Sequence, residues 1–337
     1  MSSEHAFAPF VRTLGKGRNG TRSLDRSEAR DAMAMICRYE VEPEQLGAFL
    51  MLLRVKEETA EEIAGFVDAL RASLPIGSHL PPAAIDWSAY AGKKRQLPWF
   101  VLAALILAER GHPVLMHGLS RDDERMYVPE VLAALDLPVA GSIQEAAQGI
   151  ERSGFAYLPI GRLSPLVYEL IEKRTLLGLR PPLHTVARML NPFDAPLMLM
   201  GVFHPNYAPI HQQAAVLLDQ PTALAIKGEG GEFERVPDRD ITLYGESSGK
   251  DWLEDWPSLS AKGQHLRQEK LDLKHFAAVW RGDSEDDYGA LAVKGTLALV
   301  IRALGLETSH DDAHGLAVQW WRERQTQSVQ ERHAGVL

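Results

Sequence analysis

The sequence predicts an α/β protein: a small N-terminal helical domain followed by a large domain with a mostly parallel sheet flanked by helices. Two observations lead to this prediction. Three amphipathic helix patterns lie between Asp25 and Leu70 within residues 1–79, and short apolar runs alternate with helical patterns over residues 80–337. Such alternation is typical of parallel sheets, whose strands are joined by crossover helices. We also expect part of residues 160–190 to join the N-terminal helices in space.

The composition indicates a protein of ordinary globular type. Hydrophobic residues make up 45% and charged residues 24% of the 337 residues, which is enough for a full core. Cys37 is the single cysteine, so an internal disulfide is excluded and a reducing, cytoplasmic location is expected. Neither a signal-peptide pattern nor an apolar run of membrane-spanning length is present, so no membrane partner is expected. The net charge of −9 argues against general polyanion binding but leaves room for a local basic patch.

Three helices are predicted in the first domain from local start signals. Asp25 with Glu28 and Thr59 with Glu62 form capping-box patterns, and Pro43 suits the first turn of the helix between them. Their apolar stripes exceed what three short helices can bury, so we expect a homodimer through this domain. The stripe residues that support this expectation are Leu46, Phe49, Leu50, Leu53, Phe66 and Leu70.

Residues 73–82 are rich in Ser, Pro and Gly and are predicted to be a linker. Beyond the linker, the expected strands are Pro113–Met116, Phe155–Leu158, Leu197–Val202 and Ala223–Ile226. The expected helices are Trp99–Glu109, Val128–Leu135, His211–Leu218, Tyr288–Leu304 and Asp311–Arg324. Ligands of such sheets bind at the carboxyl ends of the strands, so the loops there are the places to look for a site.

One stretch, Ala89 to Arg95, concentrates the functional signal. Gly92 allows a turn, and Lys93, Lys94 and Arg95 stand just before the helix predicted from Trp99. A helix N-terminus already carries positive dipole charge, so three cations there favour a nearby anion. The stretch is therefore interpreted as a phosphate or nucleic-acid contact. The alternative is a solvated basic turn.

Motifs spread over the chain resemble those of the anthranilate phosphoribosyltransferases. They include Gln45–Leu50, Met116–Gly118, Leu177–Arg180, Leu190–Pro192, Gly201–Pro205 and Lys227–Glu234. The resemblance implies the anthranilate phosphoribosyltransferase and nucleoside phosphorylase-like fold and a homodimer formed through the helical domain. In these enzymes a glycine-rich loop cradles the diphosphate of phosphoribosyl pyrophosphate, and a pair of acids holds magnesium.

The catalytic signature of that family is altered in this chain. The glycine-rich loop falls on Ala89, Tyr90, Ala91, Gly92 and Lys93, where only Gly92 is kept. The paired metal acids fall on Phe233 and Glu234, and one carboxylate is a poor magnesium site. We therefore expect a degenerate phosphate loop, no catalytic residue, no metal and no cofactor. Magnesium is implied only if the chain is a transferase after all.

Other residues keep or gain an anion-binding character. Arg174 falls on the arginine that holds anthranilate in the enzymes, Arg188 replaces a proline of theirs, and Arg180 lies between them. These arginines are candidate anion contacts, with surface or interdomain ion pairs as the alternative. His117 and Gly118 are candidates for the lining of a pocket, although a packed, hydrogen-bonded histidine is the alternative there.

The altered signature resembles that of the YbiB-like DNA-binding subfamily, in which the scaffold is kept and nucleic acid is bound without sequence preference. The first hypothesis is therefore a non-catalytic, dimeric nucleic-acid-binding protein, with DNA as the expected ligand, using Lys93, Lys94, Arg95, Arg174, Arg180 and Arg188. The alternative is a divergent phosphoribosyl or glycosyl transferase with an unknown acceptor. A third hypothesis is a metabolite sensor that keeps only the Arg174 side of the pocket.

Overall fold

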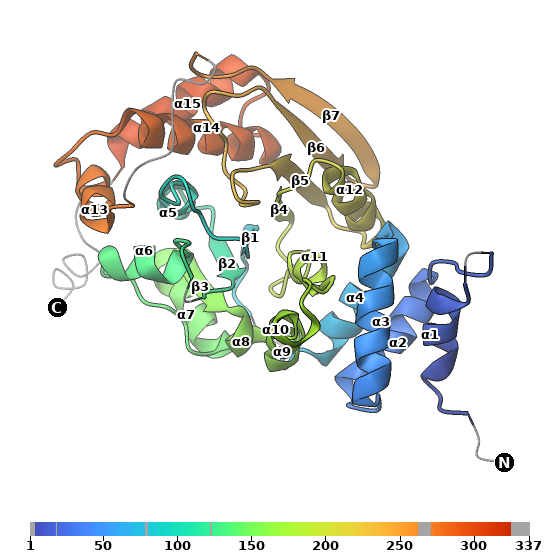
Figure 1. Cartoon of the computed structure of the whole chain (residues 1–337). Helices are drawn as coiled ribbons and strands as arrows, with labels where there is room; N and C mark the ends of the chain where they lie inside the picture. Colours follow the sequence, from blue (N-terminus) through green and yellow to red (C-terminus); the bar gives the residue numbers. More distant parts are fainter. Residues whose placement is uncertain (1–3, 18, 78–79, 122, 262–270, 325–337) are drawn as a thin grey trace.

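A computed structural model describes residues 4–17, 19–77, 80–121, 123–261 and 271–324. A seven-stranded sheet, ordered β3-β2-β1-β4-β5-β6-β7, forms the centre of the molecule (Figure 1). The strands are β1 (Ile85–Ala89), β2 (Val114–Gly118), β3 (Phe155–Pro159), β4 (Leu197–Val202), β5 (Thr222–Lys227), β6 (Ile241–Ser247) and β7 (Lys250–Trp256).

The helices precede the sheet and cover it. The N-terminal helices are α1 (Ala8–Gly15), α2 (Arg26–Cys37), α3 (Pro43–Lys56) and α4 (Ala60–Ser73). Those between the strands are α5 (Phe100–Glu109), α6 (Val128–Ala134), α7 (Ile143–Ser153), α8 (Ile160–Leu163), α9 (Pro165–Glu172), α10 (Arg174–Leu177), α11 (Leu183–Ala187) and α12 (Tyr207–Leu217). The last three are α13 (Leu273–Arg281), α14 (Asp287–Ala303) and α15 (His310–Glu323).

The sheet has the predicted, mostly parallel character. Strands β1 to β5 pair in parallel, whereas β6 and β7 add an antiparallel hairpin at one edge. The strand order reverses between β1 and β4, because the chain leaves β1 towards β2 and β3 and later places β4 on the other side of β1. A crevice at the carboxyl ends of the strands is expected at such a switch point.

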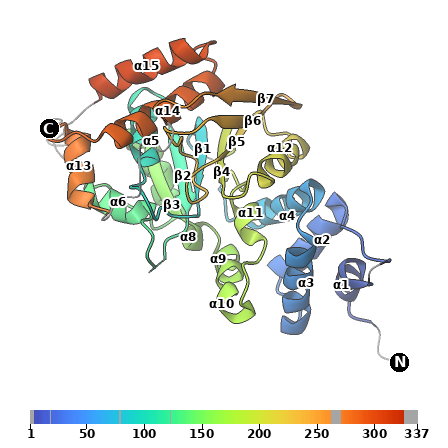
Figure 2. The same cartoon turned by 45° about the horizontal axis from the view of Figure 1, so that its top comes forward.

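The two faces of the sheet carry separate apolar clusters. Along β4, Met198 and Met200 join the cluster that includes the N-terminal helices, while Leu199 joins the cluster under α5 and α14. This alternation follows from the two-residue repeat of a strand. Helices α12 and α11 both contact α4, so the N-terminal helices pack directly on the α/β part (Figure 2).

The N-terminal helices begin where the capping patterns predicted. Both capping boxes form, at Asp25 with Glu28 and at Thr59 with Glu62, and α3 opens at Pro43. The prediction of a surplus apolar face is wrong, however. The side chains of Phe49, Leu50, Leu53, Phe66 and Leu70 are at most 1% exposed within the single chain.

The missing partner for these side chains is α1 and the residues before it. Phe7 lies edge-on to Phe49 with ring centroids 5.2 Å apart, and Phe49 lies edge-on to Phe66 at 6.0 Å. This fourth helix completes the small core. Within the described residues, no helix combines the length and the apolar character that crossing a membrane requires.

Candidate functional site

The candidate site lies at the switch point, where the loop after β1 meets the loop after β5. Gly92 has a φ of 65° and Gly230 a φ of 73°, which favour glycine. A Cβ added to Gly230 would lie 2.6 Å from the carbonyl oxygen of Gly92. The two loops therefore touch through their backbones, and a side chain at residue 230 would push them apart.

The carboxylate of Glu232 occupies the degenerate phosphate loop. Its Oε1 accepts hydrogen bonds from the backbone N–H groups of Ala91 and Gly92, each at 2.6 Å, and the residue is 2% exposed. Convergent backbone N–H groups form an anion-binding concavity, and here the anion belongs to the chain itself. Burial raises the pKa of Glu232, although Arg188 and the two N–H groups favour its charged form.

Lys93 is fully buried, so the prediction that it offers a surface cation is wrong. Its Nζ donates to Oε1 of Glu234 at 2.6 Å and forms an ion pair with Oε2 of Glu229 at 2.9 Å. Burial disfavours the ammonium, but the carboxylates of Glu234 and Glu229 outweigh that cost and raise the pKa of Lys93 above its ordinary value.

The helix after the loop also receives its anion from the chain. Oε2 of Glu234 accepts a hydrogen bond of 2.8 Å from the N–H of Phe100, the first residue of α5. The positive end of the helix dipole is thus stabilised by a carboxylate. The basic stretch was expected to require a nearby anion. The carboxylate of Glu234 supplies that anion, both to Lys93 and to the start of α5.

A buried polar chain lies beside the loop. The hydroxyl of Tyr90 is 2.7 Å from Nδ1 of His117, and Nε2 of His117 is 3.2 Å from Oδ2 of Asp86. All three residues are at most 2% exposed, and burial raises the pKa of Tyr90 well above its ordinary value. The phenol is therefore a poor nucleophile at neutral pH.

The expectation that His117 and Gly118 line an open pocket is wrong as well. The imidazole of His117 is fully buried and is engaged by hydrogen bonds on both nitrogens. A Cβ added to Gly118 would lie 1.9 Å from the carbonyl oxygen of Ala89, so the two strands are in direct contact there. His117 is the packed, hydrogen-bonded histidine of the alternative interpretation.

A group of arginines, hereafter the arginine cluster, lies next to this loop and consists of Arg121, Arg125, Arg174, Arg180 and Arg188. Nη1 of Arg125 donates to the carbonyl oxygens of Ala91 at 3.0 Å and Gly92 at 3.1 Å. The guanidinium of Arg188 lies 6.0 Å from the ring centroid of Tyr90. The cluster thus borders the loop after β1, hereafter the closed loop because its N–H groups and Lys93 are engaged by carboxylates of the chain itself.

The cluster contains more positive charge than its neighbours balance. Arg121 pairs with Glu172 at 2.7 Å, but Arg174 and Arg180 have no carboxylate partner within the described residues. Burial lowers the pKa of Arg180, and the charges of Arg125, Arg174 and Arg121 lower it further. These guanidinium groups are therefore close enough to repel one another.

His184 lies among these charges. Its Nδ1 is buried without a hydrogen-bond partner in the described part of the chain. Burial, followed by the charges of Arg188, Arg180 and Arg121, lowers the pKa of His184 to about 3. A neutral imidazole surrounded by guanidinium groups is the electrostatic arrangement that a bound anion would relieve.

The remaining predicted cations lie on the surface. Lys94 is exposed and pairs at 2.6 Å with Glu124, which is still more exposed, so the contact has little energetic value. Arg95 is exposed and has no ion-pair partner among the described residues. Sequence reasoning placed Arg174, Arg180 and Arg188 together but missed Arg125. The sequence from Arg121 to Arg125 includes acids between its two arginines, so its charge pattern predicted nothing.

The carboxylates near the loop do not fit a magnesium site. The ammonium of Lys93 lies between Glu229 and Glu234, and Glu232 is held by the loop N–H groups. Across the described ranges, no set of three or more His, Cys, Asp or Glu side chains is arranged to hold a metal ion. Magnesium prefers several oxygen ligands around an accessible octahedron, and Lys93 excludes that here.

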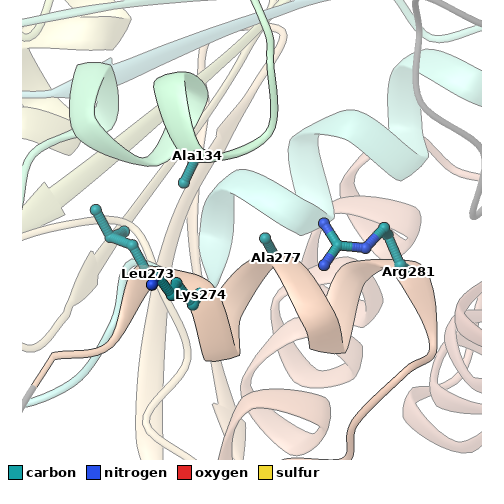
Figure 3. Close-up of a pocket in the computed structure, with 5 residues that line it drawn as sticks. All are labelled: Ala134, Leu273, Lys274, Ala277 and Arg281. Carbon is teal, nitrogen blue, oxygen red and sulfur yellow. The ribbon is translucent and has the colours of Figure 1, made fainter.

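A shallow pocket of about 340 Å³ lies elsewhere, between α6 and α13. Figure 3 shows Ala134 facing α13, with Leu273, Lys274, Ala277 and Arg281 along that helix. Arg281 is paired with Asp283 at 3.0 Å. The lining provides neither a carboxylate nor an imidazole, and its charged groups are the cationic side chains of Lys274 and Arg281.

Comparisons with known proteins agree with this geometry. Residues 9–74 match the glycosyl transferase family, helical bundle domain. YbiB of Escherichia coli (strain K12) is 29% identical over 241 residues, which cover 69% of this chain and 74% of YbiB. The anthranilate phosphoribosyltransferase of Anaeromyxobacter sp. (strain Fw109-5) is 32% identical over 208 residues, which cover 61% of this chain and 62% of the enzyme.

Solved structures show the same fold. The anthranilate phosphoribosyltransferase of Thermus thermophilus superposes with a TM-score of 0.75 at 22% identity, over 93% of this chain and 94% of the enzyme. The enzyme from Saccharomyces cerevisiae in complex with PRPP and Mg superposes with a TM-score of 0.76 at 15% identity, over 95% and 94%. The fold is that of an anthranilate phosphoribosyltransferase-like scaffold, and in its loop after β1 the backbone N–H groups of Ala91 and Gly92 are engaged by Glu232. The chain is therefore similar in sequence to YbiB and to anthranilate phosphoribosyltransferases, and its residues 9–74 match the helical bundle domain of the glycosyl transferase family.

Proposed function

We propose that this chain is a non-catalytic protein that binds nucleic acid, in the first place DNA, without sequence preference. The observation that carries the proposal is the arginine cluster, in which Arg174 and Arg180 lack carboxylate partners within the described residues and Glu172 pairs with Arg121. Guanidinium groups recognise phosphate oxygens through paired N–H donors.

The placement of the cluster suits a chain of phosphates rather than one small anion. Arg121 and Arg125 follow β2, Arg174 begins α10, Arg180 follows α10, and Arg188 follows α11. The exposed Lys94 and Arg95 extend the positive surface along the loop after β1. Contacts spread over several elements and directed at phosphates position a nucleic acid without reading its bases.

The absence of catalysis in this proposal is supported by the closed loop. Phosphoribosyl transfer from a diphosphate depends on positioning and on charge neutralisation by a metal. In this chain Glu232 engages two loop N–H groups and Lys93 engages two carboxylates, so both the phosphate and the metal would have to displace charged side chains.

The test is a salt titration of binding to fluorescent oligonucleotides. Wild type should bind single-stranded and duplex DNA of unrelated sequences with similar affinity. The slope of log affinity against log salt should be about −0.7 per phosphate contact on single strands and about −0.9 on duplex. The double variant Arg174→Ala, Arg180→Ala should flatten this slope by about two contacts, whereas the paired surface arginine in Arg281→Ala, the control, should leave it unchanged.

Three results would contradict or replace the proposal. Coincident salt-titration curves for wild type and the double variant would show that the arginine cluster does not contact the oligonucleotide. Absence of oligonucleotide binding at low salt, together with micromolar, magnesium-dependent binding of phosphoribosyl pyrophosphate in calorimetry, would favour the divergent transferase. Binding of small carboxylates alone would favour a metabolite sensor.

We also propose a homodimer formed through the helical part, and a cytoplasmic location. Val55 is 81% exposed on α3 and Leu176 is 82% exposed on α10. The two helices are neighbours, because Leu177 lies 3.9 Å from a Cβ built on Gly47. A two-fold dimer would bury these side chains against their own copies. Light scattering should give twice the chain mass for wild type and one chain mass for Leu176→Asp; a monomer at every wild-type concentration would contradict the dimer.

A further inference from the structure

We propose that Lys93 is an internal replacement for a divalent cation, and that its removal would open a metal site between Glu229 and Glu234. The ammonium lies 2.9 Å from Glu229 and 2.6 Å from Glu234, and its side chain is fully buried. This inference concerns the loop after β1 and does not depend on nucleic-acid binding.

The charges at this place are those of a metal site with a different cation. Two carboxylates converge on one buried positive charge, and a third carboxylate, Glu232, lies next to them on the loop N–H groups. Oε2 of Glu232 is buried and has no hydrogen-bond partner in the described part of the chain. Oxygen-rich, negatively charged surroundings of this kind suit hard divalent cations.

The ammonium also holds two loops together, as a bound metal ion could. It connects the loop after β1 to the loop after β5, and Glu234 continues the connection to the N–H of Phe100 at the start of α5. The backbone contact between Gly230 and Gly92 keeps the two loops close. A divalent ion between Glu229 and Glu234 would draw the same carboxylates together.

Removing Lys93 would leave two buried carboxylates without their cation. An uncompensated buried charge is costly, so the site must take up protons or a cation. The nearby carboxylate of Glu232 adds to the negative charge that the loss of the Lys93 ammonium would leave unbalanced. We therefore expect a divalent cation, present at millimolar concentration, to occupy the space of the ammonium in Lys93→Ala.

The experiment measures thermal unfolding in Mn²⁺ and in NaCl of matched ionic strength, with direct Mn²⁺ binding followed by electron paramagnetic resonance. Wild type and the control Lys94→Ala, which removes an exposed lysine one residue away, should unfold at the same temperature in both solutions. Lys93→Ala should unfold at a lower temperature in NaCl, recover part of the loss in Mn²⁺, and bind Mn²⁺ at least about tenfold more tightly than wild type.

A second variant makes the result specific to the carboxylates. Lys93→Ala, Glu234→Gln removes one ligand and should not respond to Mn²⁺. A folded Lys93→Ala without a Mn²⁺ response, or a wild type with the same response as Lys93→Ala, would overturn the inference. If Lys93→Ala does not fold in NaCl, refolding in Mn²⁺ supports the inference and failure to refold in Mn²⁺ overturns it.

Discussion

The closed loop and the arginine cluster are neighbours with opposite electrostatics. In the loop after β1, each buried charge meets an opposite charge or converging N–H groups, as Lys93 meets Glu229 and Glu234. In the arginine cluster, burial and then the facing charges of one sign lower the pKa of Arg180 and of His184. The first arrangement needs no ligand, whereas the second is relieved by an anion. Whether a basic residue is a candidate ligand contact can therefore be judged only once its partners in the folded chain are known.

The largest expected effect comes from breaking the balanced region. Lys93→Met should lower the free energy of unfolding by about 3–5 kcal/mol, because removal of one partner leaves buried carboxylates unpaired. Lys94→Met should change it by less than about 0.5 kcal/mol, since Lys94 is exposed. Urea denaturation measures both values. Equal effects of the two variants would contradict the distinction between buried and surface lysine.

The pH dependence of the free energy of unfolding should reveal the charge imbalance of the arginine cluster through His184. His184 has a pKa of about 3 in the folded chain against an ordinary 6.5, so the unfolded chain binds the proton more tightly between these values. Its contribution is therefore complete above pH 6.5 and is lost as the pH falls, at up to about 1.4 kcal/mol per pH unit. His184→Asn should flatten this slope in pH-dependent denaturation.

A bound polyanion should change that same titration. Phosphates beside Arg180 and Arg188 would offset the charges that disfavour the imidazolium, so the pKa of His184 should rise when an oligonucleotide binds. Nuclear magnetic resonance of the histidine ring follows this shift directly. An unchanged pKa in a saturated complex would place the ligand away from the arginine cluster.

Loss of one cluster charge should act in opposite directions on binding and folding. Arg180→Ala should weaken oligonucleotide binding and reduce the salt slope by about 0.7–0.9. It should leave the free energy of unfolding unchanged or raise it by up to about 0.5 kcal/mol, because the substitution removes the repulsion from Arg125, Arg174 and Arg121. A variant that loses stability would show that Arg180 has a structural partner in solution.

The smallest effect is expected at the loop carboxylate. The folded pKa of Glu232 is raised from 4.5 by burial, so the wild type loses stability as the pH rises through the range above 4.5. Glu232→Gln keeps an acceptor for the N–H groups of Ala91 and Gly92 and removes that loss. The variant should match wild type near pH 4 and exceed it at pH 8 by no more than about 1 kcal/mol. Lower stability of the variant at pH 8 would mean that the charge itself is needed.

Local signals predicted the elements that local forces specify. The capping boxes placed α2 and α4, and continuous apolar runs placed β2 to β5. Strand β1 was missed because Asp86 and Ser88 interrupt its apolar pattern, although both are buried. Strand β7 carries the exposed charged residues Lys250, Asp251 and Asp255, and β6 lacks a continuous apolar run. Helices α8, α10 and α11 have only four or five residues each, too few for an amphipathic pattern to be recognised.

The site was harder to predict because its partners are distant in sequence. Lys93 and Glu234 are 141 residues apart, so no local pattern could show that the lysine is neutralised. In the sequence Lys93 belongs to a basic run, yet Lys94 and Arg95 are exposed and Lys93 is not. The resemblance to the enzymes directed attention to the loop after β1 but carried no information on which side chains fill it.

The buried pairing of Lys93 also bears on how the sequence can change over generations. A single replacement of Lys93, Glu229 or Glu234 leaves an uncompensated charge, so each step alone is selected against, while a joint replacement of lysine and glutamate is tolerated. Substitutions at these positions should therefore be correlated among descendants. A return to a loop that accepts a metal and a diphosphate would require several simultaneous changes, including release of Glu232 from Ala91 and Gly92. The ion pairs thus couple these positions, so that each residue restricts which substitutions the others can accept.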